Sequence, residues 1–165
     1  MDRLILFRHG KAENESSSGE DFDRPLRKRG VRESAEMAQT LSRLGLVPDL
    51  VLISPSARTR ETWAAAASAF PEAEIRLEAE LYHADAGAIR RVAKSAGEVH
   101  RAVMVVGHNP GLQELAVELL REGAAPPTLI ARAQRQFPPS AAAVFLIDDN
   151  GRPSFDGLFF PERGD

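Results

Sequence analysis

The sequence predicts an α/β fold, a three-layer α/β/α sandwich with a mostly parallel central sheet. Short, wholly apolar runs alternate along the chain with longer segments whose apolar residues recur at helical spacing. The runs are apolar at every position, which is typical of strands covered by helices on both faces of a sheet. With 165 residues and no linker-like tract, the chain is predicted to form a single domain over residues 1–165.

The composition is that of an ordinary globular protein, with 43% hydrophobic and 27% charged residues. A net charge of -3 provides no general attraction to nucleic acid, and the lack of cysteine excludes disulfides and thiolate metal sites. The first apolar run, residues 4–7, is too short for a signal peptide, and no segment approaches the roughly 18 apolar residues of a membrane span. We therefore expect a cytoplasmic protein, monomeric at this size, that binds neither nucleic acid nor membrane.

The individual elements follow from apolar spacing and from glycine and proline. Helices are predicted where apolar residues recur every three or four positions, and strands where apolar residues stand together. Gly45 and Gly97 end two of the helices. In chain order we expect a strand at 4–7, a polar loop over 11–23, a helix over 30–44 and a strand at 50–53. A helix that starts at Ser54-Pro55 and is Ala-rich over 62–70 follows, and then a short strand at 75–77, a helix over 86–96, a strand at 102–106 and a helix with Pro110 in its first turn.

Proline also shapes the remaining local predictions. Ser54 and Asn109 each precede a proline, which is the pattern of a helix N-cap followed by proline in the first turn. Two proline pairs bracket residues 126–139, which we expect to be irregular. Residues 142–147 and 153–159 are predicted to form a closing hairpin.

Three of the predicted strands run into arginine and histidine side chains. Arg8 and His9 follow the first strand, Arg58 follows the second, and His108 follows the strand at 102–106. Ligands of open α/β sheets bind outside the carboxyl ends of the strands, so these four side chains are expected in one crevice, together with two helix N-termini. Two guanidinium groups and two imidazoles suit a phosphate dianion. One imidazole, kept neutral by the local positive charge, could attack phosphorus, and the other could stabilise the charge on its oxygens.

The same residues carry a resemblance to a known family. Arg8-His9-Gly10 resembles the signature (the RHG motif) of the histidine phosphatase superfamily, which includes the phosphoglycerate mutases. The stretch 54–62, Ser-Pro-Ser-Ala-Arg-Thr-Arg-Glu-Thr, resembles its second motif, and Gly107-His108-Asn109-Pro110 its third. Within that superfamily the chain is most similar to the SixA-type phosphohistidine phosphatases, notably over residues 21–30, and the likeness extends from Arg3 to about Ile147.

The resemblance implies a phosphoglycerate mutase-like fold and assigns roles to the four residues. His9 is the expected catalytic nucleophile, and Arg8, Arg58 and His108 are expected to bind the phosphoryl group of the substrate. The family uses neither a metal nor an organic cofactor, so none is expected. Glu80 is the first candidate for the proton donor, and the other candidates are Asp85 and Glu13. The resemblance leaves open whether a dedicated acid exists, because a phosphohistidine substrate has a good leaving group and needs one less.

Some neighbouring residues have two interpretations. Asp23 either orients Arg58 or caps the turn into the following proline, and we favour the turn. His83 and His100 are predicted surface histidines, although His83 could lie at the rim of the pocket. The loop over residues 11–23 is the one candidate for a lid.

Three functions compete. The leading hypothesis is a phosphatase that forms a phosphohistidine enzyme intermediate, removes phosphate from a histidine of a signalling or phosphotransfer protein, and releases inorganic phosphate. The first alternative is a small-molecule phosphomonoesterase acting on a sugar or nucleotide phosphate. The second is a phosphate-binding module without turnover.

Overall fold

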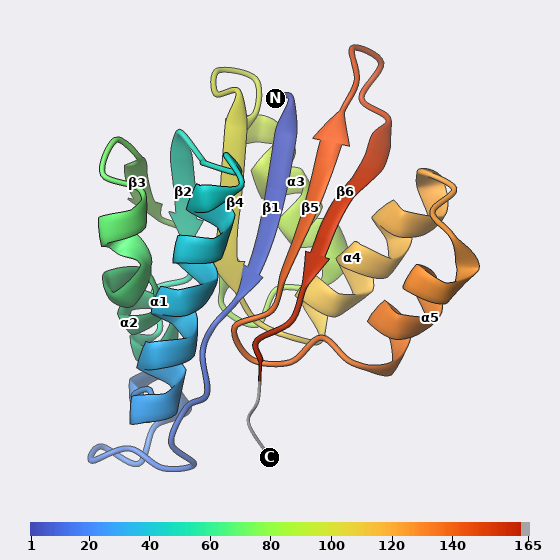
Figure 1. Cartoon of the computed structure of the whole chain (residues 1–165). Coiled ribbons are helices and arrows are strands. Elements are labelled where there is room, and N and C mark those ends of the chain that lie inside the picture. The colour runs from blue at the N-terminus through green and yellow to red at the C-terminus, as the bar shows by residue number, and fades with distance from the viewer. Residues whose placement is uncertain (163–165) are drawn as a thin grey trace.

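The computed structural model describes residues 1–162 and has one six-stranded sheet with helices on both faces (Figure 1). The strand order is β3-β2-β4-β1-β5-β6. The pairs among β1 to β4 are parallel, and β5 and β6 join the sheet antiparallel. The predicted three-layer sandwich with a mostly parallel sheet is thereby confirmed. The strands are β1 (Arg3–Arg8), β2 (Leu50–Ile53), β3 (Glu74–Leu77), β4 (Ala102–Gly107), β5 (Ala142–Ile147) and β6 (Pro153–Phe159).

Two separate cores explain why the strands are apolar at every position. Successive side chains of a strand point to opposite faces of the sheet, so neighbouring residues enter different cores. Ile5 and Phe7 pack with the α1 and α2 side, whereas Leu4 and Leu6 pack with the side covered by α3, α4 and α5. The helices are α1 (Lys28–Arg43), α2 (Ala57–Ala66), α3 (Ala86–Ala96), α4 (Gly111–Glu122) and α5 (Pro127–Arg135).

The prediction of irregular structure at residues 126–139 is wrong, because α5 occupies most of this segment. Pro126 is the N-cap and Pro127 the first helical residue, a position where the missing N–H of proline costs nothing. The second proline pair follows the end of the helix. Proline pairs therefore bound this helix rather than prevent it.

Both predicted N-caps are also wrong. The cap of α2 is Ser56, whose Oγ accepts from the N–H of Thr59, and α4 starts at Gly111 after a cis Asn109–Pro110 bond. Each predicted cap makes a different contact. The Oγ of Ser54 lies 2.7 Å from Nε2 of His108, and the Asn109 amide donates to the carbonyl of Phe137 at 2.9 Å.

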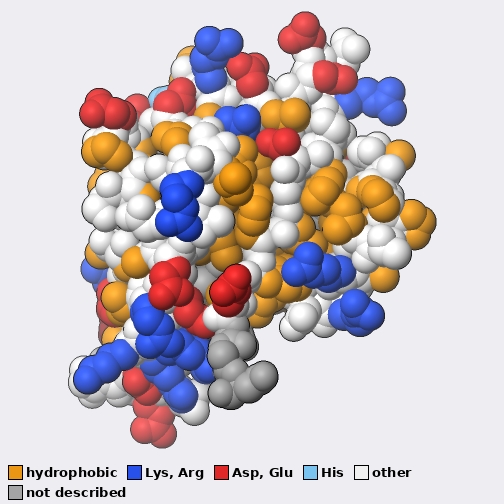
Figure 2. Space-filling view, in the orientation of Figure 1, with side chains coloured by type: hydrophobic (Ala, Val, Ile, Leu, Met, Phe, Trp, Pro, Cys, Tyr) orange, Lys and Arg blue, Asp and Glu red, His pale blue; other side chains and the backbone are white. Residues whose placement is uncertain are grey.

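The topology brings the ends of β1 and β4 together. These strands are parallel neighbours in a register that pairs Arg8 with Gly107, so His9 and His108 leave the sheet side by side. The chain then departs to α1 on one face and to α4 on the other, an arrangement that opens a crevice in many α/β proteins. Figure 2 shows a group of Lys and Arg side chains at the same end of the molecule, where α1 begins.

The loop between β1 and α1 is anchored at both ends. Ala12 pairs with Leu26 in an antiparallel bridge, and the N–H of Arg27 donates to the carbonyl of Lys11 at 2.8 Å. Gly30 permits this close approach, because a Cβ there would lie 2.2 Å from the same carbonyl oxygen. Between the anchors the loop contains a short 3-10 helix, η1 (Asp21–Asp23). Within residues 1–162, no helix is long and apolar enough to cross a membrane.

Candidate active site

A pocket of about 240 Å³ lies at the carboxyl ends of β1 and β4. The four residues singled out in the sequence, Arg8, His9, Arg58 and His108, all line it. The remaining lining residues are Lys11, Ala12, Asn14, Arg24, His83, Asn109 and Pro139. Among the residues that the structure describes, no Asp or Glu lines this pocket, so its wall is cationic and suited to an anion. A larger hollow of about 500 Å³ beside α1 and β6 is lined by no histidine and so offers no nucleophile of this kind.

His9 is held at the centre of the pocket by its backbone and by one ring nitrogen. Its N–H donates to the carbonyl of Gly107 at 3.1 Å, and Nδ1 lies 2.7 Å from the carbonyl oxygen of Gly10. A carbonyl only accepts, so Nδ1 carries the proton and Nε2 keeps its lone pair. Burial is the main cause that lowers the pKa of His9 to about 3; the hydrogen bond to Gly10 opposes this shift, and the neighbouring charge of Arg8 adds to it. The imidazole is therefore neutral near pH 7 and can act as a nucleophile.

His108 faces His9 with its ring centroid 5.4 Å away. Burial, followed by the charge of Arg58, lowers the pKa of His108 to about 3. When the Ser54 hydroxyl donates to Nε2, the proton of His108 lies on Nδ1, which is buried and has no hydrogen-bond partner in residues 1–162. An unsatisfied buried donor is costly, and an oxyanion bound in the pocket could accept its hydrogen bond.

Arg58 enters the pocket from the first turn of α2 and is 4% exposed. Its two terminal nitrogens donate to Asp21, Nη1 to the backbone carbonyl at 2.9 Å and Nη2 to Oδ2 at 3.1 Å. Thr62 ties the same turn to the nucleophile loop, since its Oγ1 donates to the carbonyl of Arg58 and accepts from the N–H of Gly10. Arg8 is oriented differently, by a hydrogen bond from Nη1 to the carbonyl of Phe137 at 3.0 Å.

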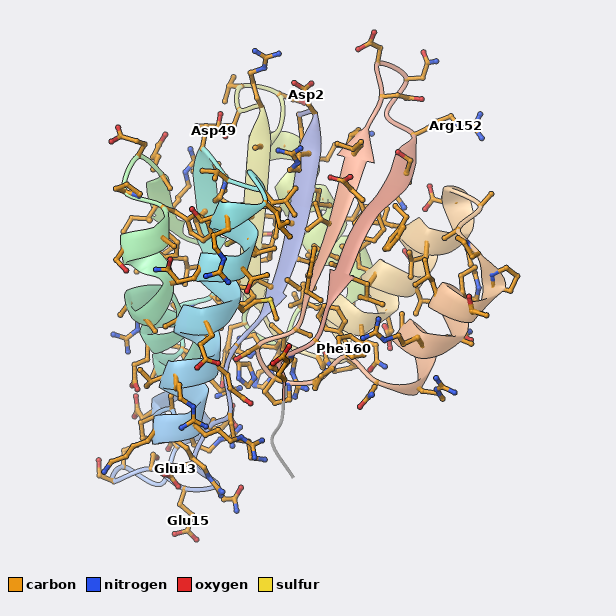
Figure 3. All side chains as sticks on the ribbon, viewed as in Figure 1. Asp2, Glu13, Glu15, Asp49, Arg152 and Phe160 are labelled. Carbon is orange, nitrogen blue, oxygen red and sulfur yellow. The ribbon has the colours of Figure 1, made fainter. Side chains whose placement is uncertain are left out.

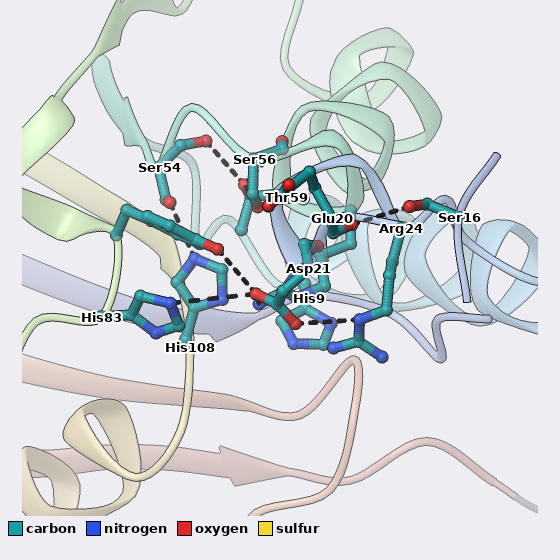
Figure 4. A network of polar contacts seen from close by, with 12 residues as sticks. His9, Ser16, Glu20, Asp21, Arg24, Ser54, Ser56, Thr59, His83 and His108 are labelled. Carbon is teal, nitrogen blue, oxygen red and sulfur yellow. Dashed lines mark hydrogen bonds and ion pairs between the residues drawn. The ribbon is translucent and has the colours of Figure 1, made fainter. Parts of the chain in front are cut away.

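Asp21 joins several of these groups, and the sequence analysis missed it (Figure 4). Its carboxylate accepts from the Tyr82 hydroxyl at 2.7 Å, from Arg58, and from Nε of Arg24 at 3.0 Å. The Tyr82 hydrogen bond is the main cause that lowers the pKa of Asp21 to about 2. Asp23, a candidate from the sequence for orienting Arg58, accepts a hydrogen bond from Ser18 instead. Asp21 and Asp23 lie two positions apart in the same polar loop, and nothing in the sequence indicates which of them contacts Arg58.

The structure does not bring the carboxylate candidates for proton donor to the pocket. Glu80 is 65% exposed, lies 4.0 Å from Arg91, and lines a separate hollow. It points outward because the next residue, Leu81, is buried in the core. Asp85 caps α3 by accepting from the N–H of Ala88, and Glu13 lies on the outer loop beside Arg27 (Figure 3).

His83 does line the pocket, at its rim, with 67% of the side chain exposed. His100 lies elsewhere and pairs with Glu74. No group of three or more His, Cys, Asp or Glu side chains able to hold a metal occurs within the part of the chain that the structure describes. The pocket thus offers two neutral imidazoles, two arginines and rim cations, a set that can bind a phosphoryl group and present a nitrogen nucleophile to it.

Known proteins resemble this chain in sequence and in fold. An uncharacterized chloroplastic protein of Arabidopsis thaliana is 32% identical over 97% of this chain and 78% of its own length. A crystal structure from Agrobacterium tumefaciens, of a protein provisionally named phosphohistidine phosphatase SixA, superposes with a TM-score of 0.84 and 30% identity over 97% of this chain and 98% of that one. A structure of the protein histidine phosphatase SixA complexed with tungstate has a TM-score of 0.76 and 26% identity, covering 94% of this chain and 95% of that one. The model of the histidine phosphatase superfamily, branch 1, matches residues 4–133, and the chain belongs to this family.

Proposed function

We propose that this chain is a phosphatase that takes a phosphoryl group from its substrate onto His9 and then passes it to water. The substrate we propose is a phosphohistidine on a signalling or phosphotransfer protein. The observation that carries the proposal is the neutral, buried imidazole of His9, with its free Nε2 in a pocket lined by Arg8, Arg58 and His108.

The chemistry follows from the position of each group. Nε2 of His9 attacks phosphorus while the bond from phosphorus to the leaving group breaks. The ring becomes positive, and its Nδ1–H remains on the carbonyl of Gly10. Arg8, Arg58 and the Nδ1–H of His108 bind the phosphoryl oxygens, on which negative charge is held in the transition state. Water then attacks phosphorus, His9 leaves as the neutral ring, and inorganic phosphate is released.

Two features favour a phosphoryl group borne by a protein histidine. The pocket of about 240 Å³ suits the phosphoryl group itself, and the rest of the substrate stays at the open rim. Similarity to solved SixA structures over nearly the whole chain supports the same substrate class.

A small phosphomonoester is the second candidate, favoured by one observation. Lys11 and Arg24 line the pocket beyond the two arginines already assigned to the phosphoryl group. Two further cations at the rim would attract a second anionic group, such as the carboxylate or second phosphate of a metabolite.

The experiment measures phosphate release from a phosphohistidine-bearing carrier protein and from a panel of sugar and nucleotide monophosphates. Wild type is compared with His9→Ala, and with Arg60→Ala as a control, because the Arg60 side chain is exposed and its Nε bonds only the carbonyl of Pro55. We expect rapid release from the carrier by wild type and the control, with none by His9→Ala. Preference for an alkyl phosphate would transfer the assignment to the metabolic phosphatase. Phosphate binding without any release or phospho-enzyme would leave only the binding module.

A further inference from the structure

We propose that His83 is a further catalytic residue, whose imidazole donates a proton to the leaving group as its bond to phosphorus breaks. The inference deepens the proposed function and rests on it. It assigns the role for which the sequence offered Glu80, Asp85 and Glu13, none of which lines the pocket.

The position of His83 suits this role. It lines the same pocket as the nucleophile, and its exposed side chain lies at the rim, where the leaving group of a substrate held outside the pocket must be. Figure 4 shows its ring directed toward Asp21, with Nε2 at 3.9 Å from Oδ2. The ring of Tyr82 packs against that of His83 at 4.0 Å and against that of His108 at 5.7 Å. The imidazole therefore lies beside the phosphoryl-binding groups.

The backbone at His83 is adapted to this placement. Its φ is 58°, a left-handed conformation that side chains other than glycine, asparagine, aspartate and histidine adopt rarely. Such conformations concentrate at functional sites, where the surrounding structure maintains them. Here the turn directs two consecutive side chains, Tyr82 and His83, to one carboxylate.

Asp21 serves as the anchor rather than as the acid. Its pKa is lowered to about 2, so it is ionised near neutral pH and has no proton to give. An ionised carboxylate near an imidazole orients the ring, as in other histidine–carboxylate pairs. The other charged or titratable groups around the pocket are Arg8, His9, Lys11, Arg24, Arg58 and His108, and none is a carboxylic acid.

The proton balance closes over one turnover. In the first step the His9 Nε2–P bond forms, the bond from phosphorus to the leaving oxygen or nitrogen breaks, and the protonated ring of His83 passes a proton to that atom. In the second step neutral His83 takes a proton from the attacking water, the new O–P bond forms, and the His9–P bond breaks. His9 returns neutral and His83 protonated, and the products are the free leaving group and hydrogen phosphate.

The test is the leaving-group dependence of phospho-enzyme formation in single-turnover experiments. Asparagine tolerates the left-handed backbone, so His83→Asn removes the proton donor and leaves the turn intact. We expect His83→Asn to slow phosphorylation of the enzyme by an alkyl phosphate by about 100-fold, the usual size of a general-acid contribution. With a nitrophenyl phosphate, whose leaving group needs no proton, we expect a change of less than about threefold, because the acid contributes little there. Glu80→Gln, the matched control, should behave as wild type with both donors.

The outcomes separate this inference from the proposed function. Equal slowing of both donors by His83→Asn, or no slowing of either, would overturn the role of His83 while the wild type still formed its phospho-enzyme. Failure of the wild type to form a His9-dependent phospho-enzyme with any donor would overturn the proposed function itself. A selective loss in Glu80→Gln would return the proton donor to the carboxylate that the sequence first suggested.

Discussion

Acid should destabilise this protein through its two buried histidines. Both His9 and His108 have a pKa of about 3 in the folded state, mainly because of burial, against about 6.5 for a histidine in an unfolded chain. The folded pKa is depressed, so the unfolded state binds more protons as the pH falls. The stability that the neutral forms provide is complete above about pH 6.5 and is lost as the pH falls toward 3.

Over most of this pH range, the loss of unfolding free energy is set by how many protons the histidines bind in the unfolded state. Between pH 7 and pH 5, protonation of one unfolded histidine favours unfolding by about 2 kcal/mol, while the folded ring stays neutral. This figure holds for any folded pKa below about 4.5, and the two residues together give about 4 kcal/mol. We therefore expect His108→Gln to lose about 2 kcal/mol less stability than wild type on going from pH 7 to pH 5.

The assay is urea unfolding of wild type and His108→Gln at several pH values, with the free energies extrapolated to water. His100→Gln is the control, because the hydrogen bond to Glu74 raises the pKa of His100, and its contribution to the pH dependence of stability therefore has the opposite sign. A raised pKa stabilises the folded state below the unfolded value, so removing His100 should make the loss on acidification larger. Parallel pH dependence in wild type and His108→Gln would refute the argument that His108 is buried in its neutral form.

Two other substitutions test the local supports of the site. Ser54→Ala leaves the buried Nε2 of His108 without its partner, so we expect a loss of about 1–3 kcal/mol in urea unfolding, and a lower kcat/KM as the ring tautomer is no longer fixed. Gly30→Ala places a Cβ 2.2 Å from the carbonyl oxygen of Lys11, so it should cost about 1–3 kcal/mol or more in the same assay. Gly87→Ala, in α3, places a Cβ in ordinary contact with Oδ1 of Asp85 at 3.5 Å, so it should instead be neutral or stabilising by up to about 1 kcal/mol. A stable Gly30→Ala variant would contradict the close packing of the loop on α1.

The elements that could be predicted from the sequence are those with a regular apolar pattern, together with the residues that directly follow such an element. Apolar runs gave β1, β2 and β4, helical spacing gave α3 over 86–96, and the order of strand and helix gave the layers. The site residues could be placed because they stand directly at strand ends, where the sheet register fixes them. The pairing of Arg8 with Gly107 is enough to bring His9 and His108 together.

Contacts between residues far apart in the sequence could not be predicted in this way. Asp21 meets Arg58 across 37 positions and Tyr82 across 61, through a loop with no period. Ser54 is a serine followed by proline, as is common at an N-cap. The cap is nevertheless Ser56, two residues later, and the hydroxyl of Ser54 contacts His108 instead. Capping preferences favoured Ser54 as the cap because they consider only neighbouring backbone groups. Its actual contact depends on His108, which is distant in the sequence.

The contact between Arg58 and Asp21 bears on how the empty pocket remains stable. A buried guanidinium without a partner would cost several kcal/mol, and Arg58 is 4% exposed. The carboxylate of Asp21, 44% exposed, supplies the opposite charge and keeps its own contact with solvent. Nε of Arg58 is buried and has no partner among residues 1–162, whereas both terminal nitrogens donate to Asp21. The resident carboxylate, however, repels a second negative charge in its vicinity, which weakens the binding of substrate and of inorganic phosphate alike. Because the repulsion acts on both anions, we expect it to raise the KM for the substrate and to weaken inhibition by inorganic phosphate together.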